Sequence, residues 1–307
     1  GSGDHLGLNY ITTLEDLAVL KRVIVQNVAP NGYAVLNADD AISARFGAVS
    51  TGNVIYFSRD RSNPLLVTHR AQGRPVVFQD GDDIALVNQN EEACRLPLKD
   101  IPLTLGGKLG FQIDNVMAAV AAAWAVEVTP DELRRGLASF TSDVGSTPGR
   151  FNLLDYRGAT VIADYGHNPD AMKALVEAVS ALPARARTVV ISGAGDRRDE
   201  DIRDQTRILG AAFDNVLLYQ DACQRGREDG EVLALLREGL EGASRTRHVE
   251  EIRGEFVAID RALESLEPGD LCLILIDQVQ EALDHLTQRV AAAEAATLFP
   301  SAAGVRA

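Results

Sequence analysis

The sequence contains few cysteines and no spacing that would pair them. It has three cysteines in 307 residues, Cys94, Cys223 and Cys272, and they lie far apart. This pattern predicts neither a disulfide framework nor a cysteine metal site, and it fits a reducing cytoplasm. The sequence also lacks an apolar run of membrane-spanning length and a signal peptide, so we expect no membrane partner.

Positive charge is in deficit, with a formal net charge of -14. This deficit argues against broad contact with nucleic acid. A phosphate loop of the form G-x-x-x-x-G-K-[ST] is also missing, because Lys108 in Gly106-Gly107-Lys108 is followed by Leu109 and no glycine has the required spacing. The 46% of hydrophobic residues is ordinary for a globular protein, and the length suits about two domains.

A linker rich in Ser, Gly and Pro, residues 141–149, divides the sequence. Before it, residues 45–105 predict a β-rich segment, with strands at Val54–Phe57, Pro64–Val67, Val76–Phe78 and Ile84–Val87. After it, strands are predicted at 151–155, 159–163, 188–192, 215–219, 245–249 and 271–276, and helices near 169–181, 200–211, 229–239, 254–266 and 279–290. This alternation predicts a mostly parallel sheet with helices on both faces. We expect residues 291–307 to be a disordered tail.

A strand-to-helix junction carries the strongest signal in the second domain. The apolar run Ala159 to Ala163 predicts a buried strand, and Asn168-Pro169 predicts the start of a helix. Asp164 and His167 therefore lie at the carboxyl end of a strand, where open α/β sheets bind ligands. The alternative, which local chemistry alone favours slightly, is that both residues only close the turn.

Lys21 falls in an apolar stripe of the first predicted helix, which a capping-box pattern opens at Thr12 to Asp16. The apolar residues on the same arc of this helix are Leu14, Leu17, Ala18, Leu20, Ile24, Val25 and Val28. Burying a lysine there is unfavourable unless the amine is paired, modified or beside a ligand. A lysine whose stem packs while its amine reaches water explains the pattern equally well.

Other polar residues stand at the ends of predicted elements. Gln112 and Asn115 share one helical face, and their carboxamides suit an adenine edge as well as helix capping. Asp39-Asp40 follows a predicted strand and suits a magnesium-bound phosphate or, at least as often, a simple turn. Arg150 follows the linker, where it would hold a phosphate or bridge the two domains.

Two charged loops follow strands of the second domain. The loop from Ser192 to Asp199 contains glycines that allow close approach to a ligand, and its charged residues are predicted to face the crevice. In the second loop, Arg225 or Arg227 suits bidentate binding of a carboxylate, and Glu228 suits a cationic substrate. For each of these three residues, a solvated charge cluster is the alternative.

Taken in order, these stretches resemble the Mur ligases and their relatives. The resemblance rests on Asp4-His5, Lys21, Ala34 to Asp40, Asn115 with Ala118-Ala119, Gly149-Arg150, Asp164 to Pro169, and Gly193 to Arg197. Within that superfamily, the sequence is most similar to the C-terminal, Mur-ligase-like module of the cyanophycin synthetase family. The stretches that carry this second similarity are Gly3 to Leu8, Glu15 to Val25, Gly32 to Asp40, Phe111 to Asn115, and Arg225 to Glu231.

The resemblance implies an α/β fold with a partial Mur-ligase central, ATP-binding domain at 1–147 and a Rossmann-like, mostly parallel C-terminal domain at 148–290. It implies a cytoplasmic amide ligase that uses ATP and Mg²⁺ to add arginine to the β-carboxyl groups of a poly-aspartate chain. We also expect a homo-oligomer, and a nucleotide pocket lined from both sides of the linker.

The resemblance also implies roles for individual residues. It gives His5 and a carbamylated Lys21 at magnesium, Gln112 and Asn115 at adenine, Arg150 and Asp164 at the phosphates and ribose, and His167 near the phosphates. Lys21 and His167 are its catalytic residues. For the incoming amino acid, it implies Gly195, Asp196, Arg197, Arg225 and Glu228.

The sequence departs from the family in two places. The family's phosphate loop would lie upstream of Asp4, so we expect a fragment, or a degenerate relative, that is inactive alone because nothing holds the β- and γ-phosphates. Phe111 stands where Mur ligases often have His. The alternatives are a fragment of a peptidoglycan Mur ligase or of a folylpolyglutamate-like ligase, and a non-catalytic remnant that binds a nucleotide or a partner.

Overall fold

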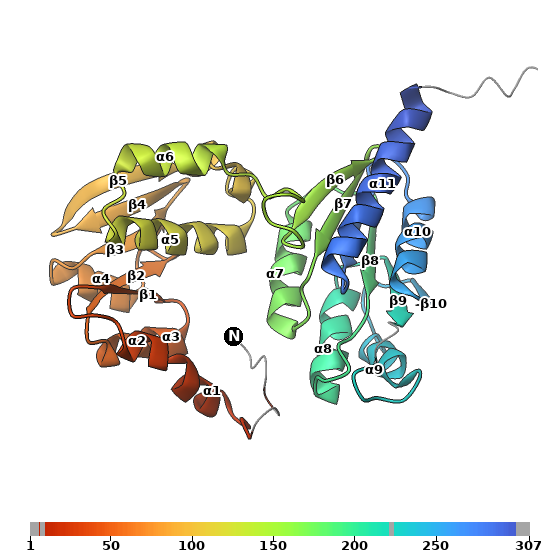
Figure 1. Ribbon diagram of the computed structural model, residues 1–307, viewed down its shortest axis with the longest axis horizontal. Coiled ribbons are helices and arrows are strands. Elements are labelled where there is room, and N and C mark those ends of the chain that lie inside the picture. Colours follow the sequence, from red (N-terminus) through yellow and green to blue (C-terminus); the bar gives the residue numbers. More distant parts are fainter. Residues whose placement is uncertain (1–5, 7–9, 221–223, 299–307) are drawn as a thin grey trace, which may run out of the picture. The chain divides into compact units, whose positions relative to one another are not determined.

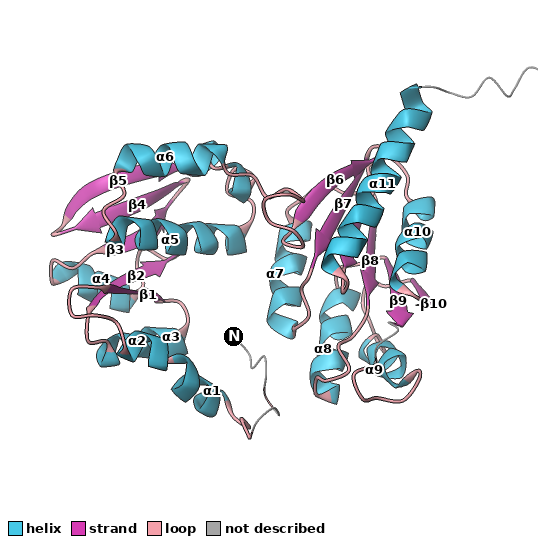
Figure 2. Cartoon of the chain, viewed as in Figure 1, coloured by secondary structure: helices cyan, strands magenta, loops and turns pink. Residues whose placement is uncertain are grey.

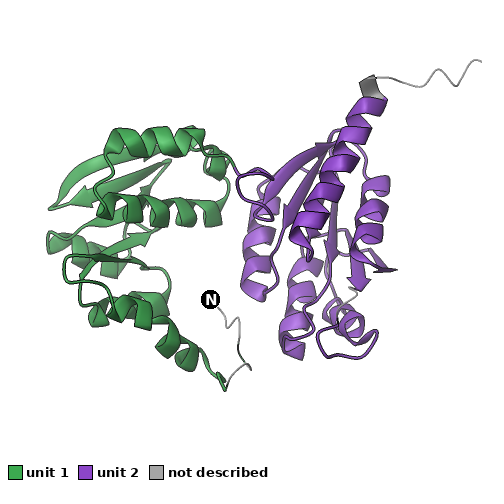
Figure 3. Cartoon of the chain, in the orientation of Figure 1, with its two compact units in different colours: residues 1–141 green, residues 142–307 purple. Residues whose placement is uncertain are grey.

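The chain forms two compact units, residues 1–141 and residues 142–307 (Figure 3). The computed structural model describes Leu6, residues 10–220 and residues 224–298. Both units combine helices with a β-sheet (Figure 2), which confirms the α/β fold class. None of the helices in the described part of the chain combines the length and the apolar character that a membrane span requires.

Unit 1 is a five-stranded mixed sheet with helices on both faces. Its elements are α1 (Leu14–Lys21), α2 (Val23–Gln26), β1 (Tyr33–Asn37), α3 (Ala41–Arg45), η1 (Phe46–Val49), β2 (Asn53–Ser58), α4 (Pro64–Ala71), β3 (Val76–Asp80), β4 (Asp83–Asn88), β5 (Glu91–Pro97), η2 (Leu98–Asp100), η3 (Pro102–Thr104), α5 (Gly110–Ala125) and α6 (Pro130–Ser139). The strand order is β1-β2-β3-β4-β5. The pairs β1–β2 and β2–β3 are parallel, and β3–β4 and β4–β5 are antiparallel.

Each face of this sheet has its own core. Ile113 and Met117 of α5 pack with Ile55 of β2 on one face. On the other face, Val25 of α2 and Leu66 of α4 pack with Ala34, Leu36 and Tyr56. Alternate strand residues therefore supply the two cores, as the two-residue period of a strand requires.

One predicted strand of this segment is wrong, because Pro64–Val67 belongs to helix α4. Asn63 caps that helix by accepting hydrogen bonds from the amides of Leu65 (3.0 Å) and Leu66 (3.4 Å). Pro64 then occupies the first helical turn, where its missing N–H is harmless. The Asn-Pro pair is a helix-start signal, and it outweighs the short apolar run that follows it.

Unit 2 contains a six-stranded sheet. Its elements are β6 (Asn152–Tyr156), β7 (Ala159–Asp164), α7 (Pro169–Ser180), β8 (Arg187–Ile191), α8 (Asp199–Gly210), β9 (Asn215–Gln220), α9 (Glu231–Gly239), β10 (His248–Arg253), α10 (Glu255–Ser265), β11 (Leu271–Leu275) and α11 (Val279–Leu298). The strand order is β10-β9-β8-β11-β7-β6. Only the β6–β7 pair is antiparallel among these pairings.

Helices cover both faces of this sheet, with α7 and α8 on one side and α10 and α11 on the other (Figure 1). On the second side, Ile259 of α10 and Leu283 of α11 share a core with Val161, Val190 and Cys272 of the strands. The mostly parallel, doubly covered sheet expected from the sequence is therefore present.

In unit 2, strand β10 and helix α11 depart most from the sequence expectation. Strand β10 begins at His248 rather than at residue 245, because Arg245 pairs with Asp214 (3.0 Å) and Thr246 donates to the carbonyl of Phe213 (3.0 Å) before the strand starts. Helix α11 continues to Leu298, past residue 291, where we expected a disordered tail. Its last turns are rich in alanine, which favours the helix.

Candidate ligand site

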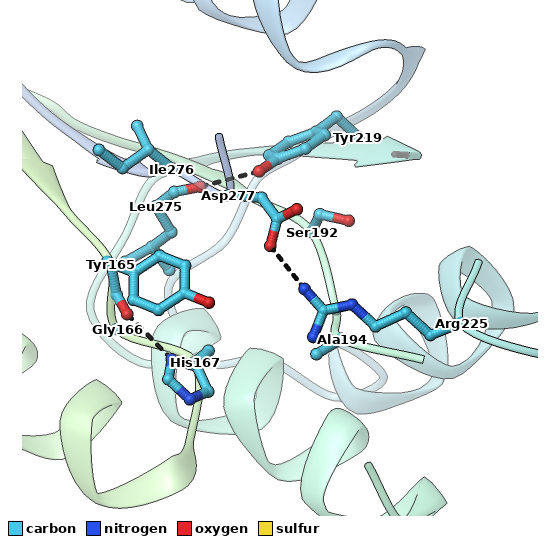
Figure 4. A pocket seen from close by; sticks show the side chains of 11 residues that line it. Tyr165, Gly166, His167, Ser192, Ala194, Tyr219, Arg225, Leu275, Ile276 and Asp277 are labelled. Atoms are coloured by element: carbon cyan, nitrogen blue, oxygen red, sulfur yellow. Dashed lines mark hydrogen bonds and ion pairs between the residues drawn. The ribbon is translucent and has the colours of Figure 1, made fainter. Parts of the chain in front are cut away.

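A pocket opens within unit 2 where four parallel strands end. Residues that follow β7, β8 and β11 line it, among them His167, Ser192, Gly193 and Asp277, together with Arg225 from the loop after β9 (Figure 4). Its empty volume is about 380 Å³, which includes space open to solvent at the mouth. The carboxyl edge of the sheet thus brings chemically active side chains together, as the parallel strands require.

The β7–α7 junction places His167 at this pocket. Asn168 caps α7 by accepting a hydrogen bond from the amide of Ala171 (2.9 Å), and Pro169 follows as the first helical residue. The imidazole Nδ1 of His167 lies 3.0 Å from the carbonyl oxygen of Tyr165. Because a carbonyl oxygen only accepts, Nδ1 carries a proton and Nε2 is the ring nitrogen left for a ligand.

Unlike His167, Asp164 has a structural contact, because its carboxylate links two neighbouring strands. It accepts a hydrogen bond from the amide of Phe151 (2.8 Å), which ties the start of β6 to the end of β7. Burial raises the pKa of Asp164 to about 6, although the amides of Phe151 and Gly166 and the charge of Arg150 act in the opposite direction. Asp164 is thus a partly buried acid next to the pocket.

Arg150 lies beside the same junction. Its guanidinium carbon is 5.9 Å from the centre of the Tyr165 ring, a cation–π distance. The carbonyl oxygen of Gly149 accepts a hydrogen bond from the amide of Tyr165 (2.9 Å). The structure therefore brings Arg150, Asp164 and His167 to one corner of unit 2.

The two charged loops of unit 2 are in direct contact. A Cβ atom on Gly195 would lie only 2.1 Å from the carbonyl oxygen of Gln224, so only glycine fits at this position. Arg227, whose side chain is 15% exposed, donates to the carbonyl oxygens of Gly195 (2.7 Å) and Arg197 (2.6 Å). Arg227 therefore holds the two loops together through these hydrogen bonds, which is a structural role.

Arg225 instead faces the pocket. Its guanidinium lies 3.1 Å from Asp277 and 3.3 Å from Asp196. Partial burial opposes its charge, but these two carboxylates raise the pKa of Arg225. Of the candidates in these loops, Arg225 lines the pocket, and Asp196 lies next to it but outside the lining. The second partner of Arg225, Asp277, follows the end of β11.

Two other candidates of these loops lie away from the pocket lining. The amide of Glu228 donates to the carboxylate of Glu231 (3.1 Å), and the side chain of Glu228 is exposed. Arg197 contributes its carbonyl oxygen to one of the hydrogen bonds from Arg227. Neither of the two lines the pocket described above.

Sequence reasoning missed three residues of this region. Asp277 lines the pocket, and its position after the last predicted strand was a signal that could have identified it. Tyr219 also lines the pocket and donates its hydroxyl to the carbonyl of Leu275 (3.1 Å). Glu255, only 2% exposed, accepts from the amide of Asp277 (2.8 Å), a contact between distant segments that no local pattern indicates.

In unit 1, the carboxamides of Gln112 and Asn115 meet at the start of α5. The amino group of Asn115 donates to the carbonyl oxygen of Gln112 (3.1 Å). Gln112 is buried and Asn115 is exposed. Their mutual bond leaves the carbonyl of Asn115 and the amino group of Gln112 as the acceptor and donor of the pair.

Lys21 is exposed, so burial beside a ligand, one of the two explanations for its place in the apolar stripe, does not apply. Helix α1 ends at Lys21, and the side chain is exposed. Within the predicted stripe, Leu20 is 54% exposed and Ile24 is 76% exposed, so this surface is not a core. The argument for a metal role from a buried lysine therefore fails, and the resemblance alone supports that role.

The structure bears on the proposed metal ligands in only two respects. His5 lies outside the residues that the structure describes. Among those that it does describe, no group of three or more His, Cys, Asp or Glu side chains is placed to hold an ion.

Two protein-family models match the chain. One, the Mur ligase middle domain, matches residues 2–123. The other, the Mur ligase glutamate ligase domain, matches residues 149–275. The two matches lie on either side of the 141–149 linker and together account for most of the sequence.

Curated relatives agree with these models. The chain is 34% identical to the cyanophycin synthetase of Geminocystis herdmanii over 92% of its own length and 32% of the relative. It is 27% identical to the UDP-N-acetylmuramoyl-L-alanyl-D-glutamate–2,6-diaminopimelate ligase of Halalkalibacterium halodurans, over 88% of this chain and 52% of that enzyme. The chain therefore spans about a third to a half of the length of these relatives.

A solved structure shares the fold. FolC of E. coli in complex with ADP superposes with a TM-score of 0.56 at 20% sequence identity. The superposition covers 83% of this chain and 52% of that one. At this identity the likeness concerns the fold alone.

Proposed function

Because the chain belongs to the Mur ligase family, we propose that it is part of an ATP-dependent amide ligase. More specifically, we propose that it is the part of a cyanophycin synthetase that adds arginine to the β-carboxyl groups of a poly-aspartate chain. The observation that carries this proposal is the similarity to cyanophycin synthetase over nearly the whole chain. On the same basis we propose a cytoplasmic homo-oligomer.

The pocket of unit 2 supports a site for a charged amino acid. Its lining combines a guanidinium, a carboxylate and an imidazole at the carboxyl edge of the sheet, and a second carboxylate, that of Asp196, pairs with the guanidinium from outside the lining. An amino acid carries groups of both signs, and paired charges of both signs complement it. We therefore propose that Asp196, Arg225 and the Gly195 backbone bind the incoming amino acid. Arg197 and Glu228, which belong to the same two loops, are the remaining proposed residues of this site.

ATP is the second substrate of the proposed reaction. Gln112 and Asn115 offer one acceptor and one donor, the pair that an adenine edge requires. In unit 2, Arg150 supplies a fixed positive charge for phosphate oxygens, and Asp164 supplies acceptors for ribose hydroxyls. These four residues are our proposed ATP-binding groups.

The chemistry of the proposed reaction is acyl-phosphate formation followed by aminolysis. The acceptor carboxylate takes the γ-phosphoryl group of ATP, and the amine of arginine then displaces phosphate to give the amide. His167 presents Nε2 to the pocket, where it accepts a proton or, once protonated, donates to a phosphate oxygen. When bound, Mg²⁺ neutralises charge on the transferring phosphoryl group, and we propose His5 and carbamylated Lys21 as its ligands.

Phosphate release tests the proposal. The assay contains ATP, Mg²⁺, a poly-aspartate primer and one amino acid at a time: arginine, meso-diaminopimelate or glutamate. It is run on this chain and on the chain joined to an upstream segment that carries a phosphate loop. We expect arginine-dependent release from the joined protein and none from the chain alone.

Other outcomes select the alternatives. If the joined protein uses meso-diaminopimelate or glutamate and not arginine, the arginine assignment is wrong and a peptidoglycan or folylpolyglutamate-like ligase is favoured. Binding of ATP without release from either protein favours a non-catalytic nucleotide-binding module.

A further inference from the structure

The guanidinium of Arg225, which lines the unit 2 pocket, pairs with two carboxylates. Asp277 also lines the pocket and is seen beside Arg225 in Figure 4, whereas Asp196 lies outside the lining. Arg225 contacts Asp277 (3.1 Å) and Asp196 (3.3 Å). The three groups together carry one net negative charge when all are ionised. This part of the pocket therefore attracts a second cation more than it attracts a neutral group.

The position of Asp277 is fixed by hydrogen bonds to a buried acid, Glu255. Glu255, at the start of α10, is 2% exposed and accepts hydrogen bonds from the amides of Asp277 (2.8 Å) and Gln278 (3.1 Å). Its carboxylate also accepts from the side-chain amide of Gln278 (3.3 Å). Glu255 thus holds the main chain of Asp277, while the carboxylate of Asp277 points to the pocket (Figure 4).

The anchoring depends on the backbone before α10. Gly254 has φ +94°, a conformation that glycine adopts readily and other residues rarely do. It lets the chain turn from β10 directly into α10, so that Glu255 reaches the turn after β11. The buried carboxylate of Glu255 accepts hydrogen bonds from Asp277 and Gln278. These bonds offset the cost of burying a charged group.

We propose that Asp277 determines specificity for a cationic side chain on the incoming amino acid, and that Glu255 is its positioning residue. The inference rests on the proposed function, since it names the group that recognises the guanidinium of the substrate. Arg225 shows that the site accepts a guanidinium. When arginine binds, its guanidinium replaces that of Arg225 at Asp277, and Arg225 turns to the carboxylate of the ligand.

This exchange of partners is compatible with the surroundings of Arg225. Its side chain is 33% exposed and that of Asp277 is 28% exposed, so neither is locked in a core. The ion pair is exchanged for two new pairs, and no buried charge is left without a partner. A ligand with a neutral side chain would separate Arg225 from Asp277 and leave the Asp277 carboxylate without a positively charged partner.

A binding experiment with a neutral isostere tests the role of Asp277. L-Arginine and L-citrulline have nearly the same shape, but the urea group of citrulline carries no charge. Titration calorimetry measures the Kd of each, with and without ATP, for the wild-type chain, Asp277→Asn and Asp229→Asn. Asp229 is the matched control, because it is an exposed acid paired with Arg253 (3.0 Å) and does not line the pocket.

We expect the wild type and Asp229→Asn to prefer arginine by about tenfold or more, the usual contribution of a charged hydrogen bond. In Asp277→Asn this preference should fall to near one, with the Kd of citrulline changed less than about twofold. A preference that survives in Asp277→Asn overturns the proposal. Equal binding of the two ligands by the wild type, or no arginine binding up to about 10 mM, overturns it as well.

Glu255→Gln tests the positioning role. Glutamine keeps one carbonyl acceptor but loses the second, so Asp277 should be held less firmly. We expect the arginine-to-citrulline preference to fall about threefold while citrulline binding is retained. A purely structural role would weaken both ligands equally, and that result would remove Glu255 from the proposal.

This test and the phosphate-release assay can fail separately. Binding of arginine is measured here without poly-aspartate or turnover. If the preference for arginine depends on Asp277 but the joined protein does not ligate arginine, the proposed function fails and the binding site stands. If arginine is ligated but Asp277→Asn keeps the preference, the proposed function stands and this assignment fails.

Discussion

Asp39 and Asp277 occupy similar places in the two units, each just beyond the carboxyl end of a parallel strand, but their contacts differ. Asp39 accepts from the hydroxyl of Ser58 (2.6 Å), the amide of Arg59 (2.9 Å) and the side chain of Asn63 (3.0 Å). Asp277 instead faces the guanidinium of Arg225 across a pocket.

The difference shows when a strand-end carboxylate is available to a ligand. Hydrogen bonds from neighbouring backbone and short side chains fix Asp39 in a turn, and exchanging them would disrupt that turn. An ion pair with a long, partly exposed side chain exchanges readily. The turn interpretation therefore fits Asp39, whereas Asp277 fits a binding role. The contrast fails if removal of Asp277 destabilises the protein as much as removal of Asp39.

The largest expected effect comes from the glycine that brings the two pocket loops together. Gly195→Ala places Cβ 2.1 Å from the backbone oxygen of Gln224, so one loop must move. We expect the free energy of unfolding to fall by about 3 kcal/mol or more and arginine binding to be lost, as measured by urea unfolding and calorimetry.

Gly136→Ala is the control for this change. Gly136 lies inside α6, and a Cβ there meets nothing within 4 Å. Alanine should stabilise that helix by about 0.5–1 kcal/mol. If Gly195→Ala behaved like Gly136→Ala, the loop contact would not be rigid and would not position Arg225.

The second prediction concerns the pH dependence of Asp164. Its folded pKa of about 6 lies above its ordinary value of 3.8. A raised folded pKa means that the protonated acid favours folding, so this contribution is complete below pH 4 and is lost as pH rises through 6. Relative to Asp164→Asn, the wild type should lose about 2–3 kcal/mol of unfolding free energy between pH 4 and pH 7.

Asp214→Asn is the control for this prediction, because the contribution of Asp214 to the free energy of unfolding should change with pH in the opposite direction. The pKa of Asp214 is lowered, because hydrogen bonds from Arg245 and from the amide of Arg187 outweigh its burial. Its contribution should be present at neutral pH and decline in acid. Parallel curves for wild type and Asp164→Asn from pH 4 to pH 7 would contradict the shifted pKa of Asp164.

The third prediction separates activity from stability at Lys21. The side chain is exposed at the end of α1, so Lys21→Ala should change the free energy of unfolding by less than about 0.5 kcal/mol. In the joined protein, loss of the proposed carbamate should lower phosphate release at least about tenfold. Added short carboxylates should restore part of it. Wild-type activity in Lys21→Ala would remove the metal role.

The sequence was most informative where local signals and fold agree. In unit 2, the regular alternation of apolar strands with capped helices predicted the sheet, and Asn168-Pro169 predicted the start of α7. Asp196 and Arg225 were found as charged residues in loops after strands. These features depend on residues close in sequence, where capping and periodicity act.

What the sequence did not predict depends on contacts between distant segments. Glu255 and Asp277 are 22 residues apart, and no local pattern links them. The wheel placed Lys21 in an apolar stripe but could not tell that this stripe is exposed, because periodicity shows which residues share a face and not whether that face is covered. Strand β5 was missed because its first residues, Glu91 and Glu92, are charged and exposed, and pairing with β4 decides their conformation.

The smallest expected effect tests the opening comparison directly, through Asp39→Ala and Asp277→Ala. Removing Asp39 deletes acceptors for Ser58 and for the amide of Arg59, so the free energy of unfolding should fall by about 1–2 kcal/mol with arginine binding unchanged. Removing Asp277 should change stability by less than about 0.5 kcal/mol, because it breaks a partly exposed ion pair, and should abolish the preference for arginine over citrulline. Urea unfolding and calorimetry on both variants give four values. If Asp277→Ala destabilises as much as Asp39→Ala, then both carboxylates hold turns, and the distinction between a structural and an exchangeable strand-end acid does not apply to this protein.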